Sequence, residues 1–200
     1  RALRLTRRDA AVVTLLTLTG PVIYQVGFSL GLKRTTTTNT ALLVATIPTW
    51  TALCSIAIGM VEIRRRLLAG IVLTLSGVLL VVLSRAESGL GLSHSELVGS
   101  TLVLGAAIAS GLANVFAKPV VDRLGSMPLA IWKYWITTVM MIVLAGPGLL
   151  SLTSAEVPTD RIPNVLYSGM LSGAGGFLAI HLAIRELGPT RSARYFNFNP

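Results

Sequence analysis

The sequence predicts an all-α fold, a polytopic bundle of transmembrane helices. Of its 200 residues, 52% are hydrophobic and only 12% are charged, and the mean hydropathy is +0.73. This is about half the charge of an average soluble domain. The charged residues lie almost entirely between long hydrophobic runs, which is typical of a polytopic membrane protein and nearly excludes a soluble one.

Six hydrophobic runs are long enough to cross a bilayer, whose core of about 30 Å needs about 20 helical residues. A seventh segment begins near Thr190, and the chain is expected to be a fragment cut at both ends. Helices are expected because a lipid environment leaves only helices or closed barrels, and alternating ten-residue strands are absent from the sequence. The predicted spans are 10–32, 37–61, 67–84, 97–118, 128–150 and 163–184.

The lysines and arginines fall unequally on the two sides of these spans. Since basic loops favour the cytoplasm, the richer side predicts a cytoplasmic N-terminal end and cytoplasmic loops at 62–66 and 119–127. The count leaves out Lys133, which lies near the end of a span. The protein is expected in the cell membrane. Twelve basic residues lie on one side (Arg1, Arg4, Arg7, Arg8, Arg64, Arg65, Arg66, Lys118, Arg123, Arg185, Arg191 and Arg194) and four on the other (Lys33, Arg34, Arg85 and Arg161).

Several other classes of protein receive little support from the sequence. The net charge of +9 comes from residues that punctuate spans, not from the exposed basic stripe of a nucleic-acid-binding face. Cys54 is the only cysteine and lies in an apolar run, so no internal disulfide or cysteine metal site is expected. Motifs for intramembrane proteolysis, zinc hydrolysis and phosphate-binding loops are missing, so neither an enzyme nor a cofactor is predicted.

A similarity between two segments of the sequence suggests that the chain contains two related halves. Laying 29–48 on 181–200 pairs Thr38 with Thr190 and Pro48 with Pro200, and it pairs the basic residues Lys33 and Arg185. In the predicted topology these two basic residues face opposite sides of the membrane. Repeats of opposite orientation are found in inverted-topology transporters.

These features resemble the EamA-type members of the drug/metabolite transporter superfamily. The resemblance rests on Ala41-Leu42-Leu43 before Pro48, on Glu62 with Arg64 to Arg66, on Gly70 and Gly77, and on Leu187-Gly188-Pro189-Thr190. It implies a ten-helix transporter made of two inverted five-helix repeats, of which the six spans correspond to the third through eighth. Residues 1–84 would belong to the first repeat, 97–200 to the second, and 85–96 to the loop between them.

Four polar residues within spans are candidates for the substrate pathway, because polar groups in hydrocarbon tend to face a cavity or another helix. Tyr24 and Gln25 lie mid-span, and Asn114 follows a run of small residues at 105–111. His181 leaves a proton-coupling role open. The alternatives are interhelical hydrogen bonding for Tyr24 and Gln25 and a structural role in close helix packing for Asn114. For His181 the alternative is a hydrogen bond between helices or at the membrane interface.

Other residues are candidates for mechanical or packing roles. Pro21, Pro48 and Pro200 are predicted sites of helix kinks or gating, since proline removes a backbone hydrogen bond. Ser168, Ser172 and Gly176 predict a smooth face for close packing. Trp132-Lys133-Tyr134-Trp135 predicts a helix anchor at the lipid headgroups, with substrate binding by Lys133 as the open alternative.

The sequence therefore predicts a secondary transporter that moves a small organic solute, with export favoured and protons left open as the coupling ion. A homodimer also stays open as a partner. The alternatives are a membrane scaffold or sensor that transports nothing and, more weakly, an ion channel.

Overall fold

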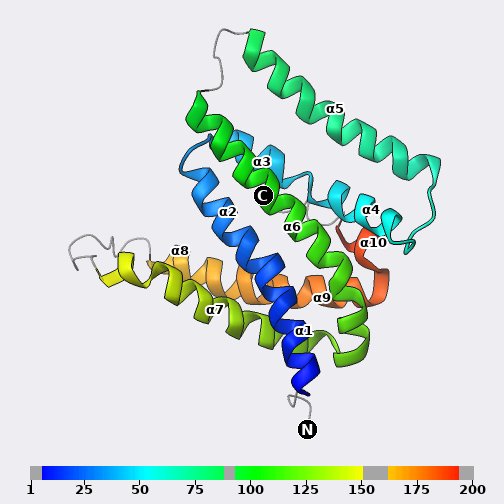
Figure 1. Ribbon diagram of the computed structural model, residues 1–200, viewed down its shortest axis with the longest axis vertical. Helices are drawn as coiled ribbons and strands as arrows, with labels where there is room; N and C mark the ends of the chain where they lie inside the picture. The colour runs from blue at the N-terminus through cyan, green and yellow to red at the C-terminus, as the bar shows by residue number, and fades with distance from the viewer. Residues whose placement is uncertain (1–5, 88–92, 151–161, 194–200) are drawn as a thin grey trace.

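The computed structural model describes residues 6–87, 93–150 and 162–193, and all regular structure in these ranges is helical (Figure 1). This confirms the predicted all-α fold. The helical segments, two of them π-helical (η1 and η4), are α1 (Arg7–Thr17), η1 (Leu18–Val22), α2 (Ile23–Leu32), α3 (Thr37–Val44), α4 (Ile47–Ala57), α5 (Arg65–Glu87), α6 (His94–Leu124), α7 (Ser126–Leu150), α8 (Ile162–Tyr167), η4 (Ser168–Gly175), α9 (Gly176–Leu187) and α10 (Pro189–Ala193).

Four helical stretches among the described residues are long and apolar enough to cross a membrane. They are Arg7–Leu32, Thr37–Ala57, His94–Leu124 and Ser126–Gly146. The other two predicted spans coincide with α5, which has 23 residues, and with the consecutive segments α8, η4 and α9. The helices thus follow the predicted spans.

The long helix α6 is the centre of the packing, with α2, α3, α4, α9 and α10 against it (Figure 1). The stretch α1–η1–α2 runs antiparallel to α6, so Gly31 lies beside Val103 and Gly27 beside Ala106. A Cβ added at Gly31 would come 2.7 Å from the carbonyl oxygen of Gly99. Small residues therefore allow the two backbones to approach closely, as is common between membrane helices.

An apolar cluster lies where α1, α6, α7 and α9 meet. Burial of these side chains fixes the α7 and α9 helices beside the α1–α6 pair. Its buried members are Val13, Leu16, Ala113, Ala117, Val120, Val121, Leu129 and Ile184, and Val12, Leu124, Trp132, Ile136 and Ile180 pack against it.

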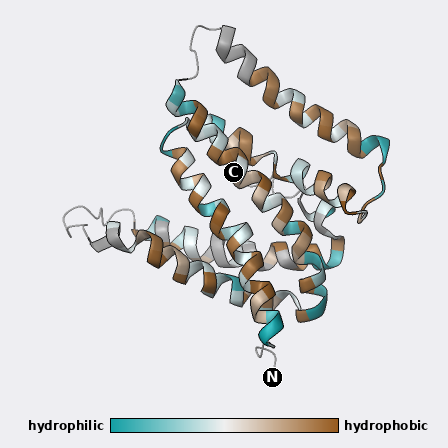
Figure 2. Ribbon diagram, viewed as in Figure 1, coloured by the Kyte–Doolittle hydropathy of each residue, from teal (hydrophilic) through white to brown (hydrophobic). Residues whose placement is uncertain are grey.

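The described outer surfaces of α5 and of the second half of α7 are strongly apolar. Figure 2 shows hydrophobic residues along both helices and hydrophilic residues gathered at the helix ends. Leu73 and Leu80 of α5 are 76% and 66% exposed. Exposed apolar side chains on this scale suit a surface that faces lipid or further helices.

One predicted loop boundary is wrong. Residues 119–124 were expected in a loop, but they belong to α6, which continues through Pro119 to Leu124. Pro119 is exposed on α6. The turn into α7 is made at Gly125, whose φ of 85° favours glycine.

Candidate functional site

The second candidate span is broken into two helices just before Pro48. Helix α3 ends at Val44 and α4 begins at Ile47, which makes Pro48 the second residue of α4. In a continuous helix the N–H of residue 48 would bond the carbonyl of Val44, and proline has no such donor. The prolyl ring therefore accounts for the place of the break.

Thr46 closes the break with its side chain. Its hydroxyl donates to the carbonyl of Leu43 at 2.5 Å and accepts the indole N–H of Trp50 at 3.0 Å. The backbone N–H groups of Thr49 and Trp50 donate to the carbonyl of Thr46. Polar groups at the break are thus satisfied within the chain, as required of non-helical backbone at membrane depth.

Helix α4 meets α6 at Gly111. A Cβ on Gly111 would lie 2.8 Å from the Cβ of Trp50 and 3.0 Å from the backbone nitrogen of Thr51. On the same helix, Thr51 and Ser55 are buried, and their hydroxyls donate to the carbonyls of the residues four positions earlier. The broken span is held against α6 by backbone contact and not by charge.

Near this break, α6 and α10 each contain one buried polar atom without a hydrogen-bond partner in the part of the chain that the structure describes. Asn114 Nδ2 and Thr190 Oγ1 have no hydrogen-bond partner among the described residues. Asn114 lies one helical turn beyond Gly111, and α10 packs on both α4 and α6. The broken span, Asn114 and α10 therefore form one candidate site, which we call the α4–α6–α10 junction.

The first span also departs from a regular helix. Pro21 lies inside the π-helical segment η1, and the hydroxyl of Thr17 donates to the carbonyl of Val13 at 2.6 Å. After this segment, Tyr24 stacks on Phe28 with 5.7 Å between the ring centres. Gln25 is exposed, and its Nε2 donates to Ser29 Oγ at 3.4 Å.

The structure does not show the four pathway candidates as one cluster. Tyr24 and Gln25 lie on α2, and Asn114 lies on α6. His181 belongs to α9, but its side chain lies outside the described residues, as does the whole of Pro200. Only Asn114 lies within the α4–α6–α10 junction.

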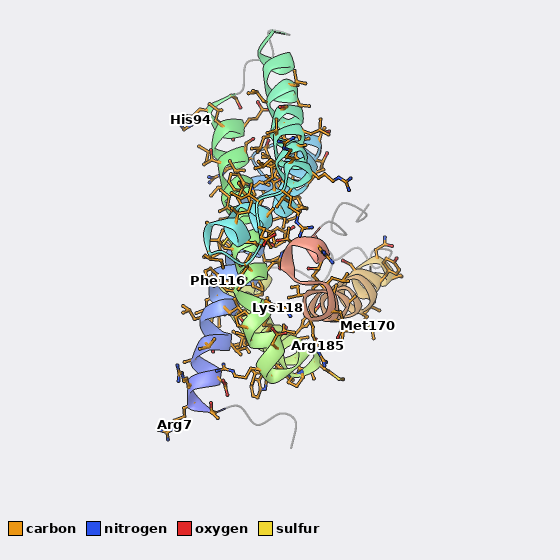
Figure 3. The ribbon with its side chains drawn as sticks, turned by 90° about the vertical axis from the view of Figure 1, so that its right-hand side faces the viewer. Arg7, His94, Phe116, Lys118, Met170 and Arg185 are labelled. Carbon is orange, nitrogen blue, oxygen red and sulfur yellow. The ribbon has the colours of Figure 1, made fainter. Side chains whose placement is uncertain are left out.

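An ion pair joins α1 to the end of α6. An Arg123 guanidinium nitrogen lies 2.6 Å from Asp9 Oδ1, and the other carboxylate oxygen accepts the hydroxyl of Thr6 at 2.7 Å. Arg7 and His94 mark opposite ends of the molecule (Figure 3). The Asp9–Arg123 pair lies at the Arg7 end, because Asp9 is in the first turn of α1.

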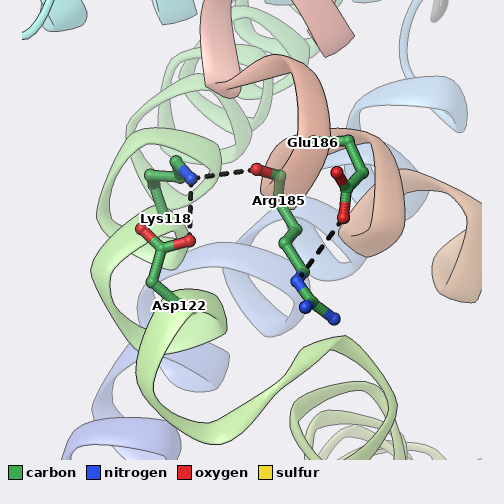
Figure 4. Close-up of polar contacts among 4 residues, drawn as sticks. All are labelled: Lys118, Asp122, Arg185 and Glu186. Carbon is green, nitrogen blue, oxygen red and sulfur yellow. Dashed lines mark hydrogen bonds and ion pairs between the residues drawn. The ribbon is translucent and has the colours of Figure 1, made fainter.

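A second polar connection joins α6 to α9 (Figure 4). Lys118 Nζ donates to Asp122 Oδ1 at 2.7 Å and to the backbone carbonyl of Arg185 at 3.0 Å, and Arg185 pairs with Glu186 at 3.5 Å. A lysine beside the last turn of a helix can donate to the carbonyls that have no partner within the helix. Its positive charge is also stabilising at the negative end of the helix dipole. Lys118 thus ties the C-terminal end of α9 to α6.

Lys133 does not lie where a headgroup anchor would lie. It is only 4% exposed and shares the buried face of α7 with Leu129. The aromatic residues around it in the sequence favoured an interfacial position. Its spacing of four residues from Leu129 and three from Ile136 was the available sign of an inward position.

The comparisons with known proteins agree with a transporter. The model of the EamA-like transporter family matches residues 2–83 and 97–200. The chain is 27% identical over 126 residues to "Uncharacterized transporter YetK" of Bacillus subtilis, a match that covers 63% of this chain and 38% of the relative. It is 24% identical over 181 residues to "Probable terminal-alkyne amino-acid exporter" of Streptantibioticus cattleyicolor, which covers 90% of this chain and 58% of that protein.

The chain thus spans between about two fifths and three fifths of the length of these curated relatives. No solved structure matches it. The two stretches that match the family model include every described helix except the start of α6 and the last residues of α5. The chain is a helical membrane protein that belongs to the EamA-like transporter family.

Proposed function

We propose that the chain is the central part of a secondary transporter that exports a small organic solute across the cell membrane. Family membership is the observation that carries this proposal, since members of a transporter family move solutes. It also favours a protein that is not an enzyme. The exporter named among the relatives supports the outward direction. An ion or solute gradient supplies the free energy, with protons as the first coupling ion to test.

Two inverted repeats, residues 1–84 and 97–200, would rock about a central path, with 85–96 as their connection. The break between α3 and α4 supports this mechanism, because discontinuous helices commonly form the binding site of such transporters. In this arrangement, the α4–α6–α10 junction contains groups from both repeats. Asn114 is its proposed polar contact with the solute.

The function is tested by comparing the solutes released by cells that overproduce the full-length protein with those released by cells that lack it. We expect at least one small organic solute to accumulate outside only with the protein, and less of it after collapse of the proton gradient. If the amount of solute released did not change when the proton gradient was collapsed, proton coupling would be refuted. An unchanged set of solutes would favour a scaffold or sensor instead.

The proposed orientation predicts which positions are reachable from each side. In a Cys54→Ser background, Met60→Cys should react with an impermeant thiol reagent only from the cytoplasm, and Thr38→Cys only from outside. Both native side chains are exposed, so the reagent is not hindered by packing. Labelling of intact cells and inverted vesicles measures this, and the reverse pattern would invert the topology.

The Asp9–Arg123 pair is proposed to hold the two repeats together at the cytoplasmic end. Because the Arg123 side chain is half exposed, the pair is weak, and we expect Asp9→Arg or Arg123→Asp to slow export only about twofold. The double swap should restore the rate, since it rebuilds the pair with opposite polarity. Glu62→Arg, at the exposed pair with Arg64, is the matched control. A double swap as slow as either single variant would refute the proposal that this pair holds the repeats together.

A further inference from the structure

The connection between α4 and α5 has a defined shape. Gly59 has a φ of 73°, in the left-handed region that favours glycine. The N–H of Met60 donates to the carbonyl of Ser55 at 2.8 Å, a bond of the kind that closes a Schellman motif at the end of a helix. The carbonyl of Arg64 accepts hydrogen bonds from the start of α5. The stretch 58–66, which we call the α4–α5 turn, is therefore fixed at both ends.

The α4–α5 turn exposes positive charge. Arg64, Arg65 and Arg66 follow one another, and all three are exposed. Arg64 lies 3.7 Å from Glu62 in an ion pair whose side chains are 74% and 88% exposed, so this pair is weak. Neither Arg65 nor Arg66 forms an ion pair with the part of the chain that the structure describes. The turn therefore carries at least two positive charges that these residues leave without a counterion.

The same turn exposes large apolar side chains. Ile58 and Met60 are each 44% exposed, and Ile63 is 65% exposed. Leu68, at the start of α5, is 43% exposed. Basic and large apolar side chains exposed together are typical of segments that lie at the boundary between lipid headgroups and acyl chains. The composition of this surface thus favours a partner that offers both an anion and hydrocarbon.

The position of the arginines along α5 agrees with this boundary. Leu73 is 76% exposed and follows Arg66 by seven residues, which is about 10 Å along the helix axis. Figure 2 shows hydrophilic residues at the start of α5 and hydrophobic residues along the rest of it. The headgroup region extends about 5–8 Å beyond each side of the hydrocarbon core. With the exposed leucines of α5 in hydrocarbon, the arginines reach the depth of the lipid phosphates.

We propose that the α4–α5 turn binds an anionic phospholipid, with its arginines on the phosphate group and its apolar side chains on the acyl chains. A guanidinium group can pair two N–H donors with two phosphate oxygens. A free phosphate ion would leave Ile63 and Leu68 uncovered, whereas a phospholipid covers them with its chains. A headgroup of net negative charge is preferred, because the ammonium group of a choline headgroup brings positive charge back to the arginines.

The test follows thermal unfolding of the purified full-length protein in an uncharged detergent. Dioleoyl phosphatidylglycerol is added in one series, dioleoyl phosphatidylcholine in a second, and glycerol 3-phosphate, which has no acyl chains, in a third. We expect phosphatidylglycerol to raise the unfolding temperature, with half-saturation at about a tenfold lower concentration than phosphatidylcholine. Glycerol 3-phosphate should leave the unfolding temperature unchanged.

Paired variants assign the binding to this turn. Arg65→Gln/Arg66→Gln should raise the phosphatidylglycerol concentration at half-saturation about tenfold, because each basic residue near an anionic headgroup adds to binding. Arg65→Lys/Arg66→Lys keeps the charge without the paired donors, so it should retain part of the affinity. Lys33→Gln/Arg34→Gln is the matched control, because it removes the same charge from another exposed turn that polar threonines follow. It should leave half-saturation unchanged.

Native mass spectrometry gives a second readout that does not depend on stability. Arg65→Gln/Arg66→Gln should retain fewer phosphatidylglycerol molecules than the wild type, and Lys33→Gln/Arg34→Gln should retain as many. Equal half-saturation by the two lipids, the same shift with glycerol 3-phosphate, wild-type binding by Arg65→Gln/Arg66→Gln, or an equal loss in the control would each overturn the assignment. Both readouts are independent of export, so failure of the transport proposal would not change them.

Discussion

Replacing Gly31 with alanine is expected to destabilise the protein by about 1–3 kcal/mol, the usual range for overpacking a well-packed interface. The added Cβ would lie 2.5 Å from Val103 Cγ2 and 2.7 Å from the carbonyl oxygen of Gly99. A side chain could rotate away, but a helix backbone cannot. Helices α2 and α6 would have to separate, and the contact that organises the bundle would weaken. Thermal unfolding of the full-length protein in detergent measures the effect.

Gly77→Ala is the matched control. Gly77 also lies within a helix, and a Cβ there meets nothing within 4 Å. Since alanine is about 1 kcal/mol better than glycine in a helix interior, this variant should be neutral or more stable. If Gly31→Ala unfolded at the same temperature as Gly77→Ala, the close approach of α2 to α6 would not be a source of stability.

The spacing of Gly27 and Gly31 shows how far sequence reasoning could reach. Two glycines four residues apart in an apolar span are a known signal for close helix contact, and this signal was overlooked. Even so, the spacing identifies only a smooth face and not the helix that covers it. The pairing with α6 depends on how the helices are arranged in space, and the hydropathy pattern of the sequence does not specify this arrangement.

The same limit explains an expected packing face that is not seen. Ser168, Ser172 and Gly176 predicted close packing, yet Ser168 and Gly176 are exposed. A Cβ added at Gly169 or Gly176 meets nothing within 4 Å. Small residues permit a close approach without requiring one, and the helices that would cover this face need not belong to this stretch of chain.

Helix positions were easier to predict than side-chain surroundings. The length of each apolar run gave the helices because bilayer thickness fixes how many residues must be apolar. Lys133 was misplaced because the aromatic residues beside it are equally compatible with an interface and with a core. Its burial depends on α1 and α9 packing over α7, which no local pattern specifies.

Replacing Pro48 with alanine is expected to slow export about fivefold without loss of folded protein. Alanine restores the N–H that can bond the carbonyl of Val44 and join α3 to α4. One intramolecular hydrogen bond is worth about 1 kcal/mol net, and about 1 kcal/mol changes a two-state ratio about fivefold. If transport requires the two half-helices to move separately, a continuous helix holds them in one arrangement. Initial export rates, corrected for the amount of protein in the membrane, measure this effect.

Two further variants separate the break from a general effect of proline. Pro48→Gly also restores the N–H, but glycine disfavours a helix by about 1 kcal/mol relative to alanine, so its rate should stay near that of the wild type. Pro119→Ala is the second control. Helix α6 already continues through Pro119, so this substitution closes no break between helices and should leave the export rate unchanged. The expected order of rates is therefore wild type, Pro48→Gly and then Pro48→Ala. A Pro48→Ala protein that exports as fast as the wild type would show that the break is only a passive bend, and that movement between the repeats occurs elsewhere in the bundle.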